Sequence, residues 1–273
     1  MKSFEITKIE DLINKLLNYK SHWIFRGQRD SSWGLTPGIE RMFVGSPYLE
    51  EFYLAVERKQ IAWFLKSAHH YAGFEDVGKH KLEILSLMQH HGIPTRLIDF
   101  TLSPFVALFF AVDDFVPIKG KKFSIWCVNF REIMKISGKI LYKKYTDAKY
   151  AGQLNSPELM FDEINSKGSN LLWVGEQQKM NLRLHKQQGT FLFQSKLDCK
   201  FSDGLSNFIK DNDDLVHKYD IPSELYFESI EMLAKMSINH ASIYPGIDGF
   251  CKQIRTQGLM LIEKGKRGMA SSK

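Results

Sequence analysis

Residues 89–101 read QHHGIPTRLIDFT and combine a helix end, a turn and the start of a buried strand. Gly92 is a typical residue to end the helix expected over about 79–90, and Pro94 forbids its continuation. The residues after this turn, 95–100, are apolar and numerous enough for one buried strand. Because two histidines, an arginine and an aspartate share the stretch, we expect it to border a pocket that binds an anion or moves a proton.

Hydrophobic spacing predicts further elements on both sides of this stretch. Apolar residues over 9–17 follow one helical face, and Ser46 with Pro47 is a typical start for a long helix. Ser103 as N-cap and Pro104 in the first turn predict another helix. The remaining expected strands are 22–25 (stopped by Gly27), 123–129, 171–175, 190–194, 217–221 and 241–244, and the remaining expected helices are 222–236 and 249–262.

The order of these elements indicates the fold class. Long helices gather in the first half, short strands are scattered along the chain, and several strands follow one another without a helix between them. This pattern predicts an α+β fold with a central antiparallel or mixed sheet rather than a doubly wound parallel one. The glycine-rich signatures of Rossmann and P-loop sites do not occur. We expect one domain over 1–273, with an insertion over 131–168 and a flexible tail over 265–273.

Composition bounds the function. Hydrophobic residues make up 44% of the 273, so a large core is expected and global disorder is excluded. The net charge of +6 suits an anionic partner, although ordinary surface charge explains it as well. The cysteines are far apart and have no histidine at ligand spacing, which argues against a metal site or a disulfide framework. No signal peptide or membrane-spanning stretch is visible, so we expect a cytoplasmic protein without a membrane partner.

Arg26 follows a short aromatic strand and is the first candidate binding residue. Its guanidinium offers a planar fork of donors to a carboxylate or a pyrophosphate. Gly27 would let a ligand approach the backbone closely. A purely structural role, pairing with Asp30 or Asp99, fits the sequence equally well.

The two histidines of the opening stretch are adjacent, so on a helix they point about 100° apart and only one faces a given pocket. The other is expected at the helix end, where the dipole favours its charged form. Asp99 in an apolar strand needs a partner, which Arg96 or Arg26 would supply. Such a pair is either part of the site or part of the scaffold.

A third polar cluster spans residues 181–191. Arg183 and Gln187 lie at helical spacing, and Gln188 leads through a glycine into a strand. Glutamine side chains cannot act as acid or base, but they can bind an amide or a ribose by hydrogen bonds. A last turn over 244–249 carries Asp248, which is expected to cap the helix that follows.

The four polar clusters, taken in their order along the chain, resemble the FRG domain. This family is named for the Phe-Arg-Gly tripeptide, which lies here at residues 25–27. Such domains are common in bacteria and their phages. The resemblance covers residues 23–28 with Trp33, Leu35 and Pro37, then 89–111, 183–191 and 243–249.

More distantly, the chain resembles ADP-ribosyltransferases of the arginine-serine-glutamate type. Residues 25–27 resemble their first core strand, residues 100–110 their second strand with its helix, and residues 187–193 lie where the glutamate-bearing strand should be. The resemblance implies a split sheet and NAD as substrate. The glutamate that stabilises the ribosyl cation is replaced here by Gln188 or Gly189. Either Asp99 or Asp248 substitutes, or the pocket binds a nucleotide without transferring it.

The resemblance implies a role for each candidate. Arg26 would hold the NAD phosphates, Thr101 and Ser103 would shape the nicotinamide pocket, and Gln188 would contact the ribose. The expected catalytic group is His90, His91, Asp99 and Gln188, and the expected binding group is Arg26, Gly27, Gln28, Arg96, Thr101, Ser103, Arg183 and Gln187.

Three functions follow as hypotheses. The first is an NAD-using ADP-ribosyltransferase-like enzyme, a toxin or phage-defence effector that modifies protein or nucleic acid and has a neutralising partner protein. The second is a non-catalytic module that binds a nucleotide or nucleic acid. The third, a nuclease or other hydrolase built on the two histidines and Asp99, would need a divalent metal, and the scarcity of clustered carboxylates counts against it.

Overall fold

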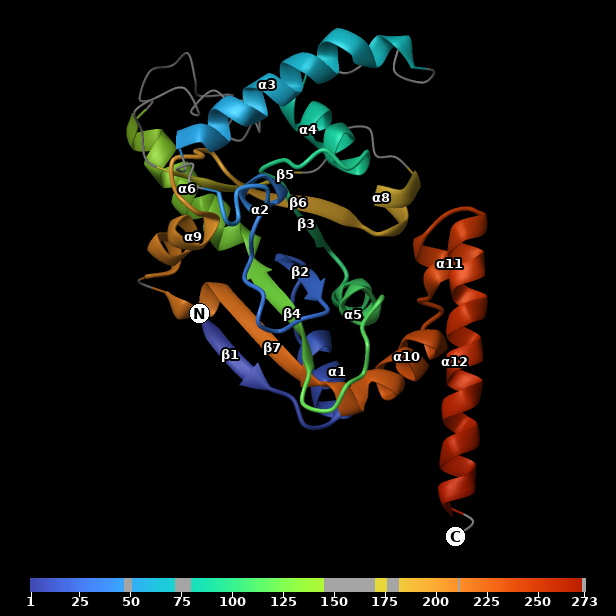
Figure 1. Ribbon diagram of the computed structural model, residues 1–273. Coiled ribbons are helices and arrows are strands. Elements are labelled where there is room, and N and C mark those ends of the chain that lie inside the picture. Colours follow the sequence, from blue (N-terminus) through green and yellow to red (C-terminus); the bar gives the residue numbers. More distant parts are fainter. Residues whose placement is uncertain (47–50, 72–79, 145–169, 176–181, 211, 272–273) are drawn as a thin grey trace.

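The core of the protein is one open, mixed sheet of seven strands in the order β1-β7-β4-β2-β3-β6-β5 (Figure 1). Strand β1 runs parallel to β7, and every other neighbouring pair is antiparallel. The expectation of a mixed helix-and-sheet fold around such a sheet is confirmed. The strands are β1 (Lys2–Glu5), β2 (Trp23–Gln28), β3 (Ile98–Thr101), β4 (Lys122–Asn129), β5 (Leu172–Gly175), β6 (Gly189–Gln194) and β7 (Val216–Pro222). The computed structural model describes residues 1–46, 51–71, 80–144, 170–175, 182–210 and 212–271.

The single sheet has a narrow joint between its two central strands, β2 and β3. Strand β2 pairs with β4 along its whole length, and β3 pairs with β6 along its whole length. Between β2 and β3, however, the register holds only Phe25 opposite Thr101. The two central strands therefore diverge beyond this pair and leave room between them.

One face of the sheet is covered by helices that enclose the largest apolar core. Alternate residues of β2, β4 and β7, such as Phe25, Cys127 and Tyr219, point into this core. Its cover comes from α1 (Ile9–Leu17), α5 (Pro104–Val112) and α10 (Tyr226–Lys235), the last preceded by the 3-10 turn η5 (Ser223–Leu225).

The opposite face and the β3-β6-β5 half pack against a second group of helices. Leu85 and Met88 bring α4 onto β5 and β6, while Ile133 and Leu141 bring α6 onto the sheet. These helices are α3 (Glu51–Ser67) with η1 (Ala68–His70), α4 (Lys81–His90), α6 (Phe130–Lys144), α9 (Phe201–Ile209) with η4 (Asp213–Leu215), and the short α2 (Gly38–Arg41) and α8 (Leu182–Lys186).

Several expected elements differ from those observed. Strand β2 does not stop at Gly27 but continues to Gln28. The stretch expected as a strand over 241–244 is helix α11 (His240–Ile243), because Asn239 and Ser242 form a capping box that starts a helix. The start expected at Pro47 for the long helix lies outside the described residues.

The segments expected as an insertion, 131–168, and as a flexible tail, 265–273, are both helical in part. Helix α6 occupies the first part of the expected insertion and contributes buried side chains to the core, while residues 145–169 are outside the described part. Helix α12 (Ile247–Ser271) continues through most of the expected tail and is the longest helix described. It extends away from the sheet, with the C-terminus at its far end (Figure 1).

Candidate functional site

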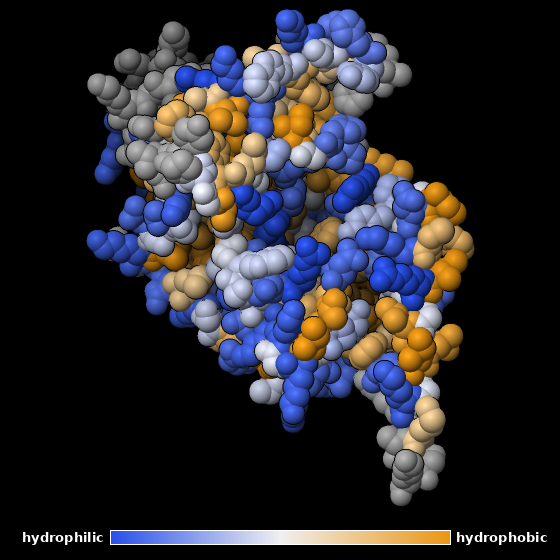
Figure 2. Space-filling view, viewed as in Figure 1, coloured by the Kyte–Doolittle hydropathy of each residue, from blue (hydrophilic) through white to orange (hydrophobic). Residues whose placement is uncertain are grey.

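A cleft of about 420 Å³ lies where β2 and β3 diverge. Its walls come from β2, the end of α4, β3, the end of α5, the α8–β6 connection and the residue that follows α11. Three sequence clusters that we expected to converge therefore do meet in one place. The volume is within the range typical of small-molecule sites. Hydrophilic side chains gather over the middle of the face shown in Figure 2.

Arg26 spans the gap between the two halves of the sheet. Its Nη1 donates a hydrogen bond to the backbone carbonyl of Asp99 at 2.6 Å and lies 3.9 Å from Oδ2 of the same residue. Its Nε is buried and has no hydrogen-bond partner among the described residues. Burial lowers the pKa of Arg26, while the negative charge of Asp99 opposes this. A guanidinium nonetheless stays protonated, so Arg26 presents a partly buried cation whose buried Nε is a spare donor.

Asp99 accepts from Arg26 as one of two expected pairings, but its setting differs from the expectation. Its side chain is 64% exposed rather than buried. Gln89 donates to its Oδ1 at 2.7 Å, and Thr95 in turn donates to the amide oxygen of Gln89 at 2.5 Å. The carboxylate is thus held by Gln89, and Thr95, on the other side of the turn at Pro94, positions the Gln89 amide.

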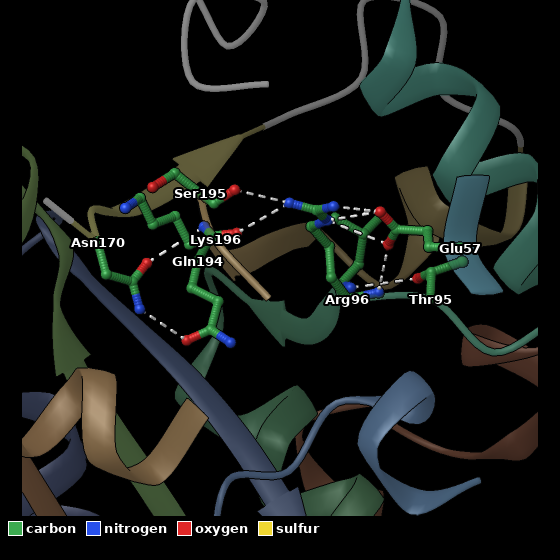
Figure 3. Close-up of polar contacts among 8 residues, drawn as sticks. Glu57, Thr95, Arg96, Asn170, Gln194, Ser195 and Lys196 are labelled. Atoms are coloured by element: carbon green, nitrogen blue, oxygen red, sulfur yellow. Dashed lines mark hydrogen bonds and ion pairs between the residues drawn. The ribbon is translucent and has the colours of Figure 1, made fainter. Parts of the chain in front are cut away.

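Arg96 was expected in the binding group, but the structure places it in the scaffold. Its side chain is fully buried, and Nε lies 2.8 Å and 3.0 Å from the two carboxylate oxygens of Glu57, which its Nη2 also contacts (Figure 3). Its Nη1 donates to the carbonyl of Ser195 at 2.8 Å. Arg96 therefore joins α3, the turn before β3 and the end of β6, and it does not line the cleft.

Gly27 and Gln28 line the cleft, but both already have a structural role: Gly27 in helix packing and Gln28 in hydrogen bonds within the protein. A Cβ on Gly27 would lie 1.9 Å from the carbonyl oxygen of Ala107 and 2.5 Å from the amide nitrogen of Ala111, so the glycine is needed for α5 to pack on β2. The Gln28 amide accepts from Trp126 at 2.7 Å and donates to the carbonyl of Gly34 at 3.0 Å. Packing explains this glycine without a ligand.

Thr101 lines the cleft, whereas Ser103 is not among its lining residues. The Thr101 hydroxyl donates to the backbone carbonyl of Gln187 at 2.7 Å and accepts from the amide of Ser103 at 3.1 Å. The Ser103 hydroxyl caps α5 by accepting from the amide of Val106. Thr101 thus fixes the α8–β6 connection against β3.

The amide that faces the cleft is Gln187, not the expected Gln188. The Nε2 of Gln187 is buried and has no hydrogen-bond partner among the described residues. Gln188 is exposed, adopts a left-handed backbone conformation with φ of 47°, and is not among the lining residues. The turn into β6 therefore rotates the second glutamine away from the site.

One of the two adjacent histidines faces the cleft, as their geometry on a helix requires. His90 is a lining residue and His91 is not, and their rings meet edge to face with centroids 4.9 Å apart. Burial lowers the pKa of His90, and the nearby charges of His91 and Arg183 lower it further. His90 is therefore neutral at physiological pH and can accept a proton.

Sequence reasoning missed Asp113, a lining residue just after α5 that contacts His240 and Tyr244. Oδ1 of Asp113 lies 2.9 Å from Nε2 of His240, and Oδ2 accepts from the Tyr244 hydroxyl at 2.5 Å. Burial works against ionisation, yet these two hydrogen bonds and the charge of Lys252 hold the pKa of Asp113 below its ordinary value. The guanidinium of Arg183 stacks on the Tyr244 ring at 5.1 Å. No local signal links Asp113 to His240, because 127 positions separate them.

The finished cleft mixes charges of both signs. Three arginines, at 26, 29 and 183, share it with the carboxylates of Asp99, Asp113 and Asp114. Asp248 is exposed in the first turn of α12 and is not a lining residue. Over the described residues, histidine, cysteine and carboxylate side chains form no group of three or more that could hold a metal ion.

Residues 21–117 match the family model of the FRG domain. The match contributes Arg26, His90, Asp99, Thr101 and Asp113 to the cleft, whereas the wall formed by the α8–β6 connection lies beyond it. Comparisons with curated proteins and with solved structures found no match. Among the described helices, none combines the length and the apolar character needed to cross a bilayer.

Proposed function

We propose that the cleft binds NAD and that the protein is an ADP-ribosyltransferase-like enzyme. One observation carries the proposal. The three segments that resemble the core strands of that family contribute Arg26, Thr101 and Gln187 to a single cleft, and their strands β2, β3 and β6 are neighbours in the sheet. The narrow joint between β2 and β3 also supports the resemblance to a split sheet.

The cleft offers the hydrogen-bonding and stacking groups that a dinucleotide needs. A buried donor without an acceptor costs free energy, so Nε of Arg26 and Nε2 of Gln187 favour a ligand that brings acceptor oxygens to both. The pyrophosphate and ribose oxygens of NAD provide them. The stacked pair of Arg183 and Tyr244 supplies a flat surface for an aromatic ring.

The reaction would break the bond between the nicotinamide nitrogen and C1′ of its ribose, and the electron pair would leave with nicotinamide. The acceptor's nucleophile then bonds to C1′ and loses a proton, for which neutral His90 is the acceptor in the cleft. Positive charge that develops on the ribose is stabilised by a nearby ionised carboxylate. Asp113, kept ionised by His240 and Tyr244, is the buried candidate, while Asp248 is not a lining residue.

The test is to incubate the protein with NAD and bacterial protein and RNA, and to measure nicotinamide release and label transfer. We expect Arg26→Ala and Asp113→Asn to lose at least about tenfold in turnover, as removal of a charge-stabilising group does. Arg131→Ala, an exposed arginine on α6, should match the wild type. Transfer to protein or to RNA would identify the acceptor, and with it the toxin or phage-defence role and any neutralising partner.

A second candidate function is favoured because the resemblance places Gln188 or Gly189 where a glutamate is expected, and because the amide that lines the cleft is Gln187. Gln187 can hold a ribose but cannot stabilise a cation as a carboxylate does. In that case the cleft is a non-catalytic module for a nucleotide or nucleic acid. Calorimetry with NAD, ADP-ribose and short RNA separates the two, because binding without nicotinamide release leaves only the module.

A further inference from the structure

Helix α12 exposes large apolar side chains on the face that points away from the rest of the protein. A helix that packs only on its own domain would bury such side chains. Residues at Lys252, Gln253, Thr256 and Met260 are partly covered by the rest of the protein. On the outer face Ile247, Ile254 and Leu261 are 69%, 52% and 71% exposed. Figure 2 shows hydrophobic side chains along the edge that α11 and α12 form in Figure 1.

The outer face has a regular seven-residue pattern. Ile247, Ile254 and Leu261 form a row, and small residues stand between and beyond them at Cys251, Gly258 and Gly265. A Cβ on Gly258 or on Gly265 would meet no atom within 4 Å, so neither glycine is needed for packing inside the chain. Spacings of three and four residues along a helix form the seam of a coiled coil.

We propose that this outer face of α12 binds the same face of a second copy, so that the two helices pair antiparallel. Bulky and small residues alternate along the seam, and the bulky side chains of one helix then fit over the glycines of the other. Small residues that permit close backbone approach have value against another helix and none against a lipid surface. The outer face is therefore self-complementary in shape.

Charge sets the orientation of the pair. The C-terminal part of α12 is basic, with Lys264 and Lys266 exposed beside the seam, whereas Asp248 is exposed near its start. Parallel helices would place the two basic segments side by side. Antiparallel helices place each basic segment near Asp248 of the other copy, and they also oppose the two helix dipoles.

Sedimentation of the full chain over a range of concentrations tests the proposal. We expect a monomer–dimer equilibrium whose Kd rises at least about a hundredfold in Ile254→Asp, because the dimer would bury two unpaired carboxylates. The matched control is Trp63→Asp, which replaces another exposed apolar residue, on α3, and should leave the Kd unchanged. Circular dichroism should show both variants folded.

Disulfide cross-linking in a Cys251→Ser background tests the orientation. Gln257→Cys, beside the middle of the helix, should cross-link two copies, while Ile247→Cys at its start should not, since antiparallel helices keep the two starts apart. Cross-linking through position 247 would overturn the antiparallel arrangement. A wild-type monomer at every concentration would overturn the dimer, and flotation of that monomer with anionic vesicles would assign the face to a lipid surface instead.

Discussion

At the residue scale, the buried pair of Arg96 and Glu57 holds three segments together. The sequence indicated that Asp99 would need a partner and offered Arg96 or Arg26, but Arg96 pairs with Glu57 instead. Glu57 lies 39 positions away on a helix whose exact rotation on the sheet no local pattern fixes. Partners so far apart in the sequence are set by how helices pack on the sheet, and this packing cannot be read from a single sequence.

Removing one member of that pair should strongly destabilise the protein. Arg96→Met leaves the Glu57 carboxylate buried without its partner, which typically costs about 3–5 kcal/mol. Urea unfolding followed by circular dichroism measures the loss. Lys135→Met, which breaks an exposed pair with Glu132, should cost less than about 1 kcal/mol. Equal losses in the two variants would contradict the scaffold role of Arg96.

Asp113 should make stability depend on acid pH. Its folded-state pKa lies below the unfolded value near 3.9, so the ionised form stabilises the fold above that pH. This contribution is lost as the pH falls through the folded-state pKa. We therefore expect Asp113→Asn to be destabilised at pH 7 and to approach the wild type in acid, as measured by urea unfolding at several pH values. A difference that does not change with pH would refute this linkage.

At the element scale, the sequence predicted helix ends best, because neighbouring serine, proline and glycine residues determine where a helix starts and stops. Helix α5 begins at its Ser103 cap and Pro104 as expected. Helix α4 ends at His90, just before Gly92, which has φ of 86°. Helix α11 was not predicted, because residues 241–244 were expected to form a strand. The capping box of Asn239 and Ser242 starts a helix there instead. The rotation between Gln187 and Gln188 was also beyond reach, because it depends on one left-handed residue in the turn.

The packing of α5 on β2 makes the tripeptide glycine indispensable. Gly27→Ala would force its Cβ against the backbone of Ala107 and Ala111, so we expect a loss of about 3 kcal/mol or more. Gly138→Ala is the matched control, because a Cβ there meets open space within helix α6. That change should stabilise the protein by about 0.5–1 kcal/mol. Thermal unfolding of both variants tests the expectation, and it fails if Gly27→Ala is neutral.

At the scale of the whole molecule, the candidate site is a consequence of the narrow joint in the sheet. No residue pattern in the sequence predicts that the two central strands β2 and β3 pair at a single position. Its effect is to bring the buried donors of Arg26 and Gln187, which are far apart in the sequence, into the lining of one cleft. The opening, rather than any one residue, brings the separate clusters together.

Titration calorimetry of NAD with two neighbouring variants tests this account most directly. Gln187→Asn shortens the amide that faces the cleft, and Gln188→Asn makes the same change at an exposed position that tolerates the left-handed backbone. We predict saturable NAD binding that Gln187→Asn weakens about tenfold, the loss of one hydrogen bond, and that Gln188→Asn leaves unchanged. Absence of NAD binding, or equal weakening by both substitutions, would contradict the account.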